Sequence, residues 1–335
     1  MNKRIGKATL QFEKPVYIHS YGTVVGPQEK AGPLGEKFDY DFPNNLYNED
    51  SWEKAEQKMQ RYAMEIALEK GGKLSSDLDC YIGGDLLNQI IASSFNARTM
   101  QVPYLGLYGA CSTLAESLVV GSCLIDGGFA QRIGVCTSSH HDTAERQLRY
   151  PTEMGVQRPL TAQWTVTGSG AYILDENSPS GIVIKKGIIG KIIDLGIADN
   201  NDMGTAMAPA AIDTIATFLE DNPNLTDIDL VVTGDLGYIG QELCFQGLLN
   251  KGHDLKGKYL DCGALIYTKS QDVHAGGSGC GCSATVLGAH FLPMLQSKQV
   301  KKILLVGTGA LLSPASVQQG ETIPCIAHGV LIEAV

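Results

Sequence analysis

The residue best placed to do chemistry is Cys111, which lies in the segment GACST at 109–113. A turn followed by small polar residues is typical of a helix start, where free backbone N–H groups and the helix dipole favour a thiolate. With a base and oxyanion donors nearby, such a thiolate is a nucleophile for acyl transfer. The competing interpretation is a small buried thiol, which is common for cysteine. The local sequence therefore predicts either a nucleophile or the wall of a pocket.

An internal repeat gives Cys111 a counterpart in the second half. The segments DLDCYIGGDL and DIDLVVTGDL match at a distance of 150 residues, and their predicted strands lead into Asp85 and Asp235. A predicted helix follows in each copy, one opening on Cys111 and the other near Cys282. The remaining strands of the repeat are predicted at 132–139 and 167–174 in the first half and at 302–309 and 327–335 in the second.

Two copies of one α/β unit predict an α/β fold with pseudo-twofold halves, residues 1–180 and 181–335. The strand ends and the two inner helices should meet near the centre. An outer helix is predicted between a cap at Asp50 and Glu53 and a stop at Gly71-Gly72.

The outer parts of the two copies are less regular. Residues 20–50 are rich in turn formers and lack a sustained period, which predicts an irregular surface segment. A second outer helix is predicted at about 206–220, and short strands at 78–84 and 228–234.

Composition excludes several classes of protein. The 335 residues include 26 Lys and Arg against 36 Asp and Glu, and the net charge of -10 gives no overall attraction to nucleic acid or anionic lipid. The N-terminus lacks the apolar core of a secretory signal, and no apolar run approaches the ~20 residues of a membrane span. We therefore expect synthesis in the cytoplasm and, at a membrane, only a peripheral place.

The 9 cysteines are an odd number in a chain without an export signal, which indicates reduced thiols rather than a disulfide framework. Only Cys280 and Cys282 are close in sequence, and a lone CxC is weak evidence for zinc. No metal site is predicted.

Short motifs along the whole chain carry a resemblance to known proteins. They are GDLLNQ (84–89), GACST (109–113), ERQLRYPTE (145–153), DMGTAMAPAA (202–211), GGSGCGCSA (276–284), TGALLSP (308–314) and IPCIAHG (323–329). In this order they resemble the stage V sporulation protein AD family of endospore-forming bacteria. The order of elements is also similar to the thiolase-like superfamily, and within it to ketoacyl-acyl-carrier-protein synthase III.

The resemblance implies a five-layered α/β/α/β/α fold, commonly dimeric. For the sporulation family it implies a non-catalytic protein that binds dipicolinic acid (pyridine-2,6-dicarboxylate) or its calcium chelate. The ligand would be taken up into the forespore and released in germination. The expected partners are membrane subunits of the stage V sporulation A system, at the spore inner membrane, with a homodimer expected and neither nucleic acid nor a cofactor.

The resemblance also identifies what Cys111 lacks. In ketoacyl synthase III the corresponding strand of the second half ends in a histidine, whereas here it leads into Asp235. The other partner is an asparagine in a turn before the second inner helix, and Gly279-Cys280 stands there. Without the imidazole and amide, acyl transfer loses contributions of about 3 to 4 kcal/mol each. We therefore expect no turnover.

A rigid aromatic dianion needs fixed donors, arginines that pair bidentately with carboxylates, and flat apolar walls. Helix-start amides near Cys111 and Cys282 are candidate donors. The segment 138–166 supplies arginines, although for each of them ion pairing in a solvated or dimer-contact loop is an equal alternative. The predicted ligand-binding residues are Cys111, His140, Arg146, Arg149, Tyr150, Thr165, Asp235, Cys280, Cys282 and His328.

Direct calcium binding is not predicted, because calcium needs about 6 to 8 oxygen ligands and no D-x-D-x-D-G loop is present. The segment DNNDMG at 199–204 is expected to form a loop or helix cap, and any calcium should arrive with the ligand. Two alternatives from other classes stay open. One is an acyl transferase that uses Cys111, and the other is an adaptor that organises membrane partners without a ligand.

Overall fold

The computed structural model describes residues 3–149 and 158–335. Its strands are β1 (Arg4–Ile5), β2 (Thr9–Val25), β3 (Tyr40–Asp41), β4 (Cys80–Gly84), β5 (Tyr104–Gly106), β6 (Arg132–Ser139), β7 (Trp164–Thr165), β8 (Gly168–Asp175), β9 (Ile182–Ile188), β10 (Leu230–Thr233), β11 (Tyr259–Asp261), β12 (Gly277–Ser278), β13 (Lys302–Ala310) and β14 (Cys325–Ala334).

The helices are α1 (Pro27–Lys30), α2 (Trp52–Gly71), α3 (Ile91–Met100), α4 (Thr113–Asp126), α5 (His141–Leu148), α6 (Met203–Asp221), α7 (Gly237–Asn250), α8 (Cys262–Leu265), α9 (Cys280–Val286), α10 (Leu292–Gln296) and α11 (Pro314–Gln318). Two short helical segments matter for the site. A 3-10 turn, η4 (Ala110–Ser112), precedes α4, and a π-helical stretch, η7 (Leu287–Phe291), joins α9 to α10.

The main sheet has the strand order β11-β10-β13-β14-β9-β2-β8-β6-β4-β5, with β1 and β3 paired to β2. From the central antiparallel pair β2 and β9 outward, both halves repeat one pattern. The next two pairings are antiparallel in each half, β2–β8 and β8–β6 in the first and β9–β14 and β14–β13 in the second, and the outer pairings are parallel. The repeat seen in the sequence is therefore a repeat of topology. Because all these strands belong to one sheet, the division into 1–180 and 181–335 stays a prediction.

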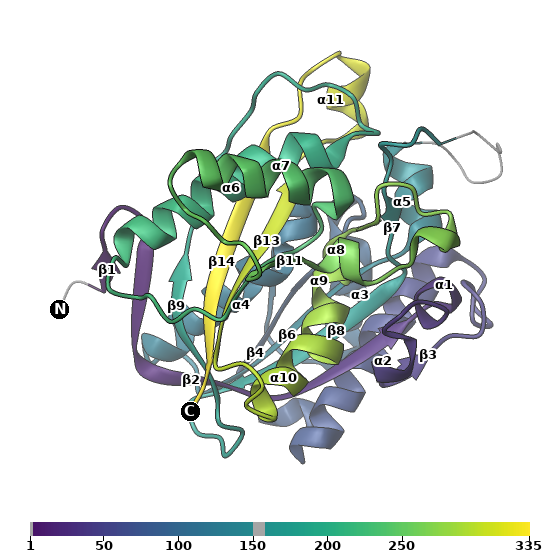
Figure 1. Ribbon diagram of the computed structural model, residues 1–335. Helices are drawn as coiled ribbons and strands as arrows, with labels where there is room; N and C mark the ends of the chain where they lie inside the picture. Colours follow the sequence, from purple (N-terminus) through teal and green to yellow (C-terminus); the bar gives the residue numbers. More distant parts are fainter. Residues whose placement is uncertain (1–2, 150–157) are drawn as a thin grey trace.

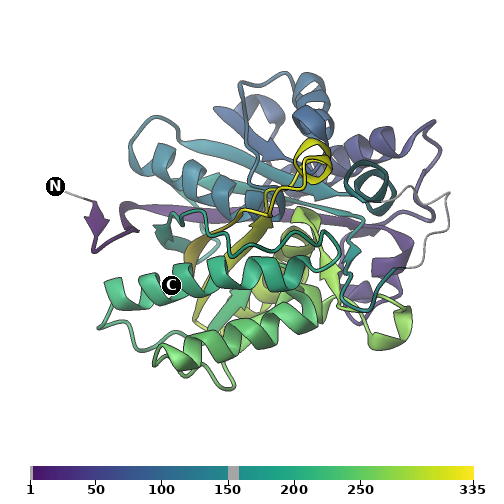
Figure 2. The ribbon, with the colours of Figure 1, turned by 90° about the horizontal axis from the view of Figure 1, so that it is seen from above.

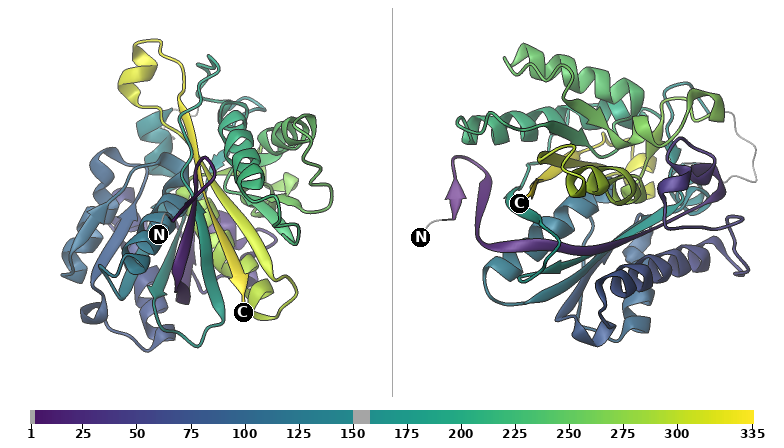
Figure 3. Two further views of the ribbon diagram at one scale, coloured as in Figure 1. Left: turned by 90° about the vertical axis from the view of Figure 1, so that its left-hand side faces the viewer. Right: turned by 60° about the horizontal axis from the view of Figure 1, so that its bottom comes forward.

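The sheet folds around two inner helices (Figures 1 and 2). Helix α4 packs against β2 and β6 on one side and against β13 and β14 on the other, and α9 packs against β6 and β8. Helices α2 and α3 cover the outer face of the first half, and α6 and α7 cover that of the second (Figure 3). The result is an α/β/α/β/α arrangement.

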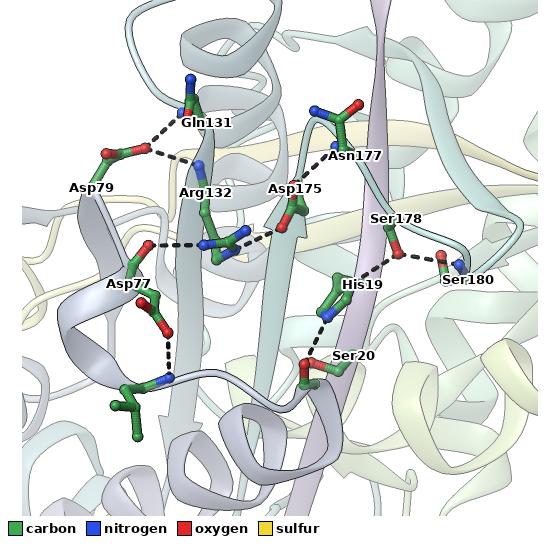
Figure 4. Close-up of polar contacts among 12 residues, drawn as sticks. His19, Ser20, Asp77, Asp79, Gln131, Arg132, Asp175, Asn177, Ser178 and Ser180 are labelled. Atoms are coloured by element: carbon green, nitrogen blue, oxygen red, sulfur yellow. Dashed lines mark hydrogen bonds and ion pairs between the residues drawn. The ribbon is translucent and has the colours of Figure 1, made fainter.

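Polar contacts link the start of β6 to the end of β8 and to the residue before β4 (Figure 4). Arg132, at the start of β6, pairs through Nε with Asp175 Oδ2 at the end of β8, at 2.6 Å. The carboxylate of Asp79 accepts hydrogen bonds from the backbone N–H groups of Gln131 and Arg132. These contacts hold the register of β4, β6 and β8, whose opposite ends form the site.

Several boundaries differ from the sequence predictions. Residues 20–25 are not irregular but form the end of β2, where Val24 and Val25 are fully buried and pair with β8. Gly22, taken for a turn former, allows β2 to approach the backbone of α2 at Ala63. The cap of α2 is Ser51, whose hydroxyl accepts from Lys54 N, rather than Asp50. The predicted stop is confirmed, because Gly72 adopts the left-handed conformation there.

Other predictions agree with the structure or differ by a few residues. Strand β6 coincides with the prediction of 132–139, and α6 begins at Met203, slightly before the predicted helix. Within the described residues, no helix is long and apolar enough to cross a membrane.

Close packing of α9 on β8 generates a stability prediction. A Cβ on Gly170 would overlap the carbonyl oxygen of Ala284, so we expect Gly170→Ala to lower the free energy of unfolding by about 3 kcal/mol. The control Gly320→Ala meets no neighbour and strains only a left-handed backbone, which costs about 1 kcal/mol. Urea unfolding followed by circular dichroism measures both, and equal losses would show that the close contact is not a constraint.

Candidate functional site

A small cavity of about 20 Å³ lies beside η4, near the carboxyl ends of β4 and β13. Thr165 and Ser278 both line it and lie side by side, because they are partners in the parallel pairing of β7 with β12. Its walls are mostly apolar, formed by Leu86, Tyr108, Ala110, Leu148, Met203, Ala310 and Leu312. Its polar groups belong to Cys111, Arg149, Thr165, Asn200 and Ser278.

Cys111 lines the cavity from η4 and is 4% exposed. The preceding residue, Ala110, has a positive φ of 49°, which turns the chain sharply before the helix. The helix-start amides are not free as expected, since Ser112 N–H donates to Gly109 O and Thr113 N–H donates to Ala110 O. In the second half, Gly281 N–H donates to Ser139 Oγ and Cys282 N–H to Gly279 O. These four donors are therefore already used inside the protein.

Asp235 occupies the place expected for a base, and its charge acts on Cys111. Its carboxylate accepts hydrogen bonds from Thr308 Oγ1 at 2.6 Å and from Gly279 N–H at 2.8 Å. Burial raises the pKa of Asp235 to about 7, although these hydrogen bonds favour the ionised form.

This environment disfavours a thiolate at Cys111. Burial raises the pKa of the Cys111 thiol well above its ordinary value, and the negative charge of Asp235 raises it further. Activated cysteines need the opposite, a cation or an imidazolium beside the sulfur. Cys111 is therefore a neutral thiol in the wall of the cavity.

Arg149 is the cation that lines the cavity. Its side chain is 5% exposed and pairs with Glu145 at 2.6 Å. The guanidinium also donates from Nη2 to Thr165 Oγ1 at 3.1 Å and from Nη1 to Gln163 O at 3.4 Å. Arg149 is the C-cap of α5, with φ of -131° and ψ of -95°. At this residue the backbone leaves the helical path. The cation is thus buried and fixed in direction.

Other predicted site residues are placed elsewhere. Arg146 is 44% exposed, pairs with Glu53 and lies over the ring of Trp52, so it belongs to the surface. His140 is fully buried away from the cavity lining, and its Nε2 contacts Asn45 O at 2.8 Å. For Arg146 the structure agrees with the alternative prediction, an ion pair on the surface. Arg149 forms an ion pair with Glu145 and also lines the cavity.

Three predicted residues of the second half, Cys280, Cys282 and His328, are not among the residues that line the cavity. Cys280 contacts Cys111 and donates from Sγ to Ser138 O at 2.8 Å, and Cys282 is part of the apolar core. His328 Nδ1 accepts from Gly190 N–H, and burial lowers the His328 pKa to about 4, so it is neutral and structural. Tyr150 lies outside the described residues.

Of the twelve lining residues, the sequence reasoning missed nine, among them four that have a recognisable sequence signal. Asn200 and Met203 belong to DNNDMG, which was assigned to a loop or cap, and its overlap with the motif DMGTAMAPAA was the available signal. Tyr108 directly precedes GACST and Ser278 precedes Gly279, so their proximity to the two inner helix starts could have indicated them. No cluster of three or more His, Cys, Asp or Glu side chains able to hold a metal occurs among the described residues.

Comparison with known proteins identifies the family. A model of the family described as stage V sporulation protein AD (SpoVAD) matches residues 6–333. A protein of that name from Bacillus subtilis (strain 168) is 48% identical over 332 residues, covering 99% of this chain and 98% of the relative. The chain belongs to the stage V sporulation protein AD family. The motif-based resemblance is thereby confirmed.

Solved structures confirm the thiolase-like fold of this SpoVAD family member. The 3-oxoacyl-[acyl-carrier-protein] synthase III from Aquifex aeolicus has a TM-score of 0.58 at 14% identity, covering 95% of this chain and 99% of that one. A Xanthomonas campestris OleA structure has a TM-score of 0.62 at 12% identity, covering 96% and 99%. At such low identity the likeness extends to the fold and no further.

The neutral state of Cys111 predicts slow alkylation. With iodoacetamide at pH 7, we expect the exposed Cys123 to react first and Cys111 to react at least ~10 times more slowly. Peptide mass spectrometry over time measures both, and labelling after denaturation is the control for detection. Equal rates at Cys111 and Cys123 in the folded protein would restore the nucleophile interpretation.

Proposed function

We propose that this SpoVAD family member is a non-catalytic binding protein for dipicolinic acid, alone or as its calcium chelate. It would take part in uptake of the ligand into the forespore and in its release during germination. The observation that carries the proposal is the buried cation of Arg149 in a cavity that is lined mostly by apolar side chains. Such a lining suits a small aromatic carboxylate, and we propose that the walls of this small cavity move apart to admit it.

The polar groups around Arg149 support binding of a planar anion in one orientation. Thr165 and Ser278 carry hydroxyls that are held by the pairing of β7 and β12, and Asn200 adds an amide to the lining. An arginine with fixed direction pairs a carboxylate through two parallel hydrogen bonds. Leu148 and Leu312 give the ring apolar surfaces. A second carboxylate would then reach the hydroxyl side.

The proposal includes partners and a location. The family's expected setting is a membrane assembly, and we propose that this protein works at its periphery, beside membrane subunits of the stage V sporulation A system. We also propose a homodimer. Strand β5 ends the sheet and carries Leu105, which is 44% exposed, and Phe95 and Tyr108 are exposed nearby. An open apolar edge of this kind favours pairing with a second copy, which sedimentation velocity measures.

Binding can be tested by calorimetry with dipicolinic acid, using benzoate as the comparison ligand. We expect heat from dipicolinate and little from benzoate, because only the former offers two carboxylates. Arg149→Gln should weaken binding by about 10- to 100-fold, since it removes hydrogen bonds to a charged group. The matched control Lys251→Gln removes an exposed cation just after α7 and should leave affinity unchanged. Absent or equal heats for the two ligands would end the binding proposal.

The alternative function is acyl transfer by Cys111, in the manner of ketoacyl synthase III. The high pKa of the Cys111 thiol and the carboxyl of Asp235 in place of an imidazole argue against it. On incubation with acetyl-CoA we therefore expect no adduct in the intact mass, in the wild type or in Cys111→Ala. An adduct of one acetyl group that disappears in Cys111→Ala would favour the enzyme instead.

A further inference from the structure

Helix α5 and strand β7 hold a group of charged and aromatic side chains, of which the binding proposal uses only Arg149. The two elements pack together (Figure 1). His141, Glu145 and Arg149 follow one another at intervals of four residues, so they lie along one face of α5 and its end. The His141 ring stacks on Trp164 of β7, with 3.6 Å between ring centroids and 3° between planes. The guanidinium of Arg158 lies over the same indole, 4.8 Å from its centroid.

The ion pair between Arg149 and Glu145 is close but incomplete. Glu145 Oε1 lies 2.6 Å from Arg149 Nη2, and the two side chains are 7% and 5% exposed. This oxygen is nevertheless among the buried polar atoms that accept no hydrogen bond within the described part of the chain. The hydrogen bonds of the guanidinium go to Thr165 Oγ1 and Gln163 O instead. The pair therefore lacks the two aligned hydrogen bonds of a strong arginine–carboxylate contact.

Arg158 is a second cation with an unused donor. Its Nη2 donates to the backbone oxygen of Asp272, whose carboxylate is 84% exposed and lies 3.9 Å away, so this ion pair contributes little. Its Nη1 is buried and has no hydrogen-bond partner among residues 3–149 and 158–335. A buried donor of this kind costs free energy until it finds an acceptor.

The charge of Arg158 acts on the same carboxylate as that of Arg149. Burial raises the pKa of Glu145, and the charges of Arg149 and Arg158 oppose this, whereas that of Asp142 adds to it. Together with the shared stack on Trp164, this places Arg158 beside Glu145. Glu145 thus stands between two guanidinium groups. One of them lines the cavity, and the other does not.

We propose that Glu145 is an exchangeable counter-ion, which neutralises Arg149 in the free protein and turns to Arg158 when an anion binds, leaving the guanidinium of Arg149 to the ligand. No covalent bond forms or breaks, and no proton is transferred. The inference rests on the proposed anion binding. It assigns Glu145 and Arg158 as positioning residues that act through Arg149, without contact to the ligand.

The exchange avoids the two costly alternatives for a buried anion. If Glu145 stayed in place, two negative groups would share one guanidinium, and one of them would lack a counter-charge. If Glu145 were left without any cation, its own charge would be buried unpaired. After the exchange, each carboxylate has a guanidinium, and the open Nη1 of Arg158 gains an acceptor. Glu145 also makes the site selective, since a ligand has to bind Arg149 better than Glu145 does.

Removal of Glu145 should strengthen binding. In Glu145→Gln the competitor is lost and Arg149 stands unpaired in the free protein, so we expect dipicolinate to bind about 10-fold more tightly in calorimetry. Glu242→Gln is the matched control, because it removes an exposed carboxylate of α7 with the same change in net charge. Its affinity should equal that of the wild type.

Removal of Arg158 should weaken binding only while Glu145 is present. Arg158→Gln takes away the second partner of Glu145, so we expect about 10-fold lower affinity for dipicolinate. In the Glu145→Gln background the same substitution should change affinity by less than about twofold, because no carboxylate needs to be received. A direct contact between Arg158 and the ligand predicts the same loss in both backgrounds. Lys251→Gln, which removes an exposed cation, should have no effect in either.

The outcomes distinguish the exchange from anion binding itself. Absence of dipicolinate heat in the wild type and in every variant would overturn the binding proposal and the exchange with it. Binding by the wild type that is unchanged or weaker in Glu145→Gln, or equal losses from Arg158→Gln in both backgrounds, would overturn the exchange alone. Thermal unfolding confirms that each variant is folded during the titration.

A crystal structure of the wild-type protein with dipicolinate provides a check that needs no variant. We expect a ligand carboxylate on the guanidinium of Arg149 and the Glu145 carboxylate on Arg158. Ligand bound at Arg149 with Glu145 still paired to Arg149 would contradict the exchange and leave the binding proposal intact.

Discussion

Both inner helices begin in direct contact with glycines of the strands behind them, and the centre of the molecule depends on this contact. Gly170 of β8 faces the backbone of Ala284 in α9, and Gly309 of β13 faces Gly109 and Ser112 around η4. A side chain at either glycine would push the helix start away from the strand ends. Close approach brings the polar strand ends and the two cysteine-bearing turns together. The cavity is the space left between them.

Within this frame, the charge beside Cys111 decides what the thiol can do. An imidazole can accept the thiol proton and then stabilise the thiolate as a cation, which makes a nucleophile. A buried carboxyl such as Asp235 opposes the same ionisation by its like charge. The fold of a condensing enzyme is therefore compatible with a thiol whose pKa is raised rather than lowered. The difference in the expected chemistry comes from two places, the strand end at Asp235 and the turn at Gly279-Cys280.

Much of the fold could be predicted, because the repeat, the strand β6 and the left-handed stop at Gly72 follow from local patterns. The end of β2 could not, because its Gly22 serves close packing on α2, and a single sequence does not distinguish that use from a turn. The site was harder still. His140 and Arg146 are near Arg149 in sequence, but β6 buries the first and α5 exposes the second. Only the non-helical C-cap of α5 distinguishes Arg149, and a cap geometry of this kind has no clear sequence signal.

The balance of charge in the cavity constrains any anion that enters it. Arg149 already faces Glu145, so the pair brings little net charge to the site, and a dianion would leave an uncompensated buried charge. Such burial is costly unless a counter-charge accompanies it. A calcium chelate arrives with its charge reduced, whereas a free dicarboxylate has to recruit a proton or displace Glu145 from Arg149.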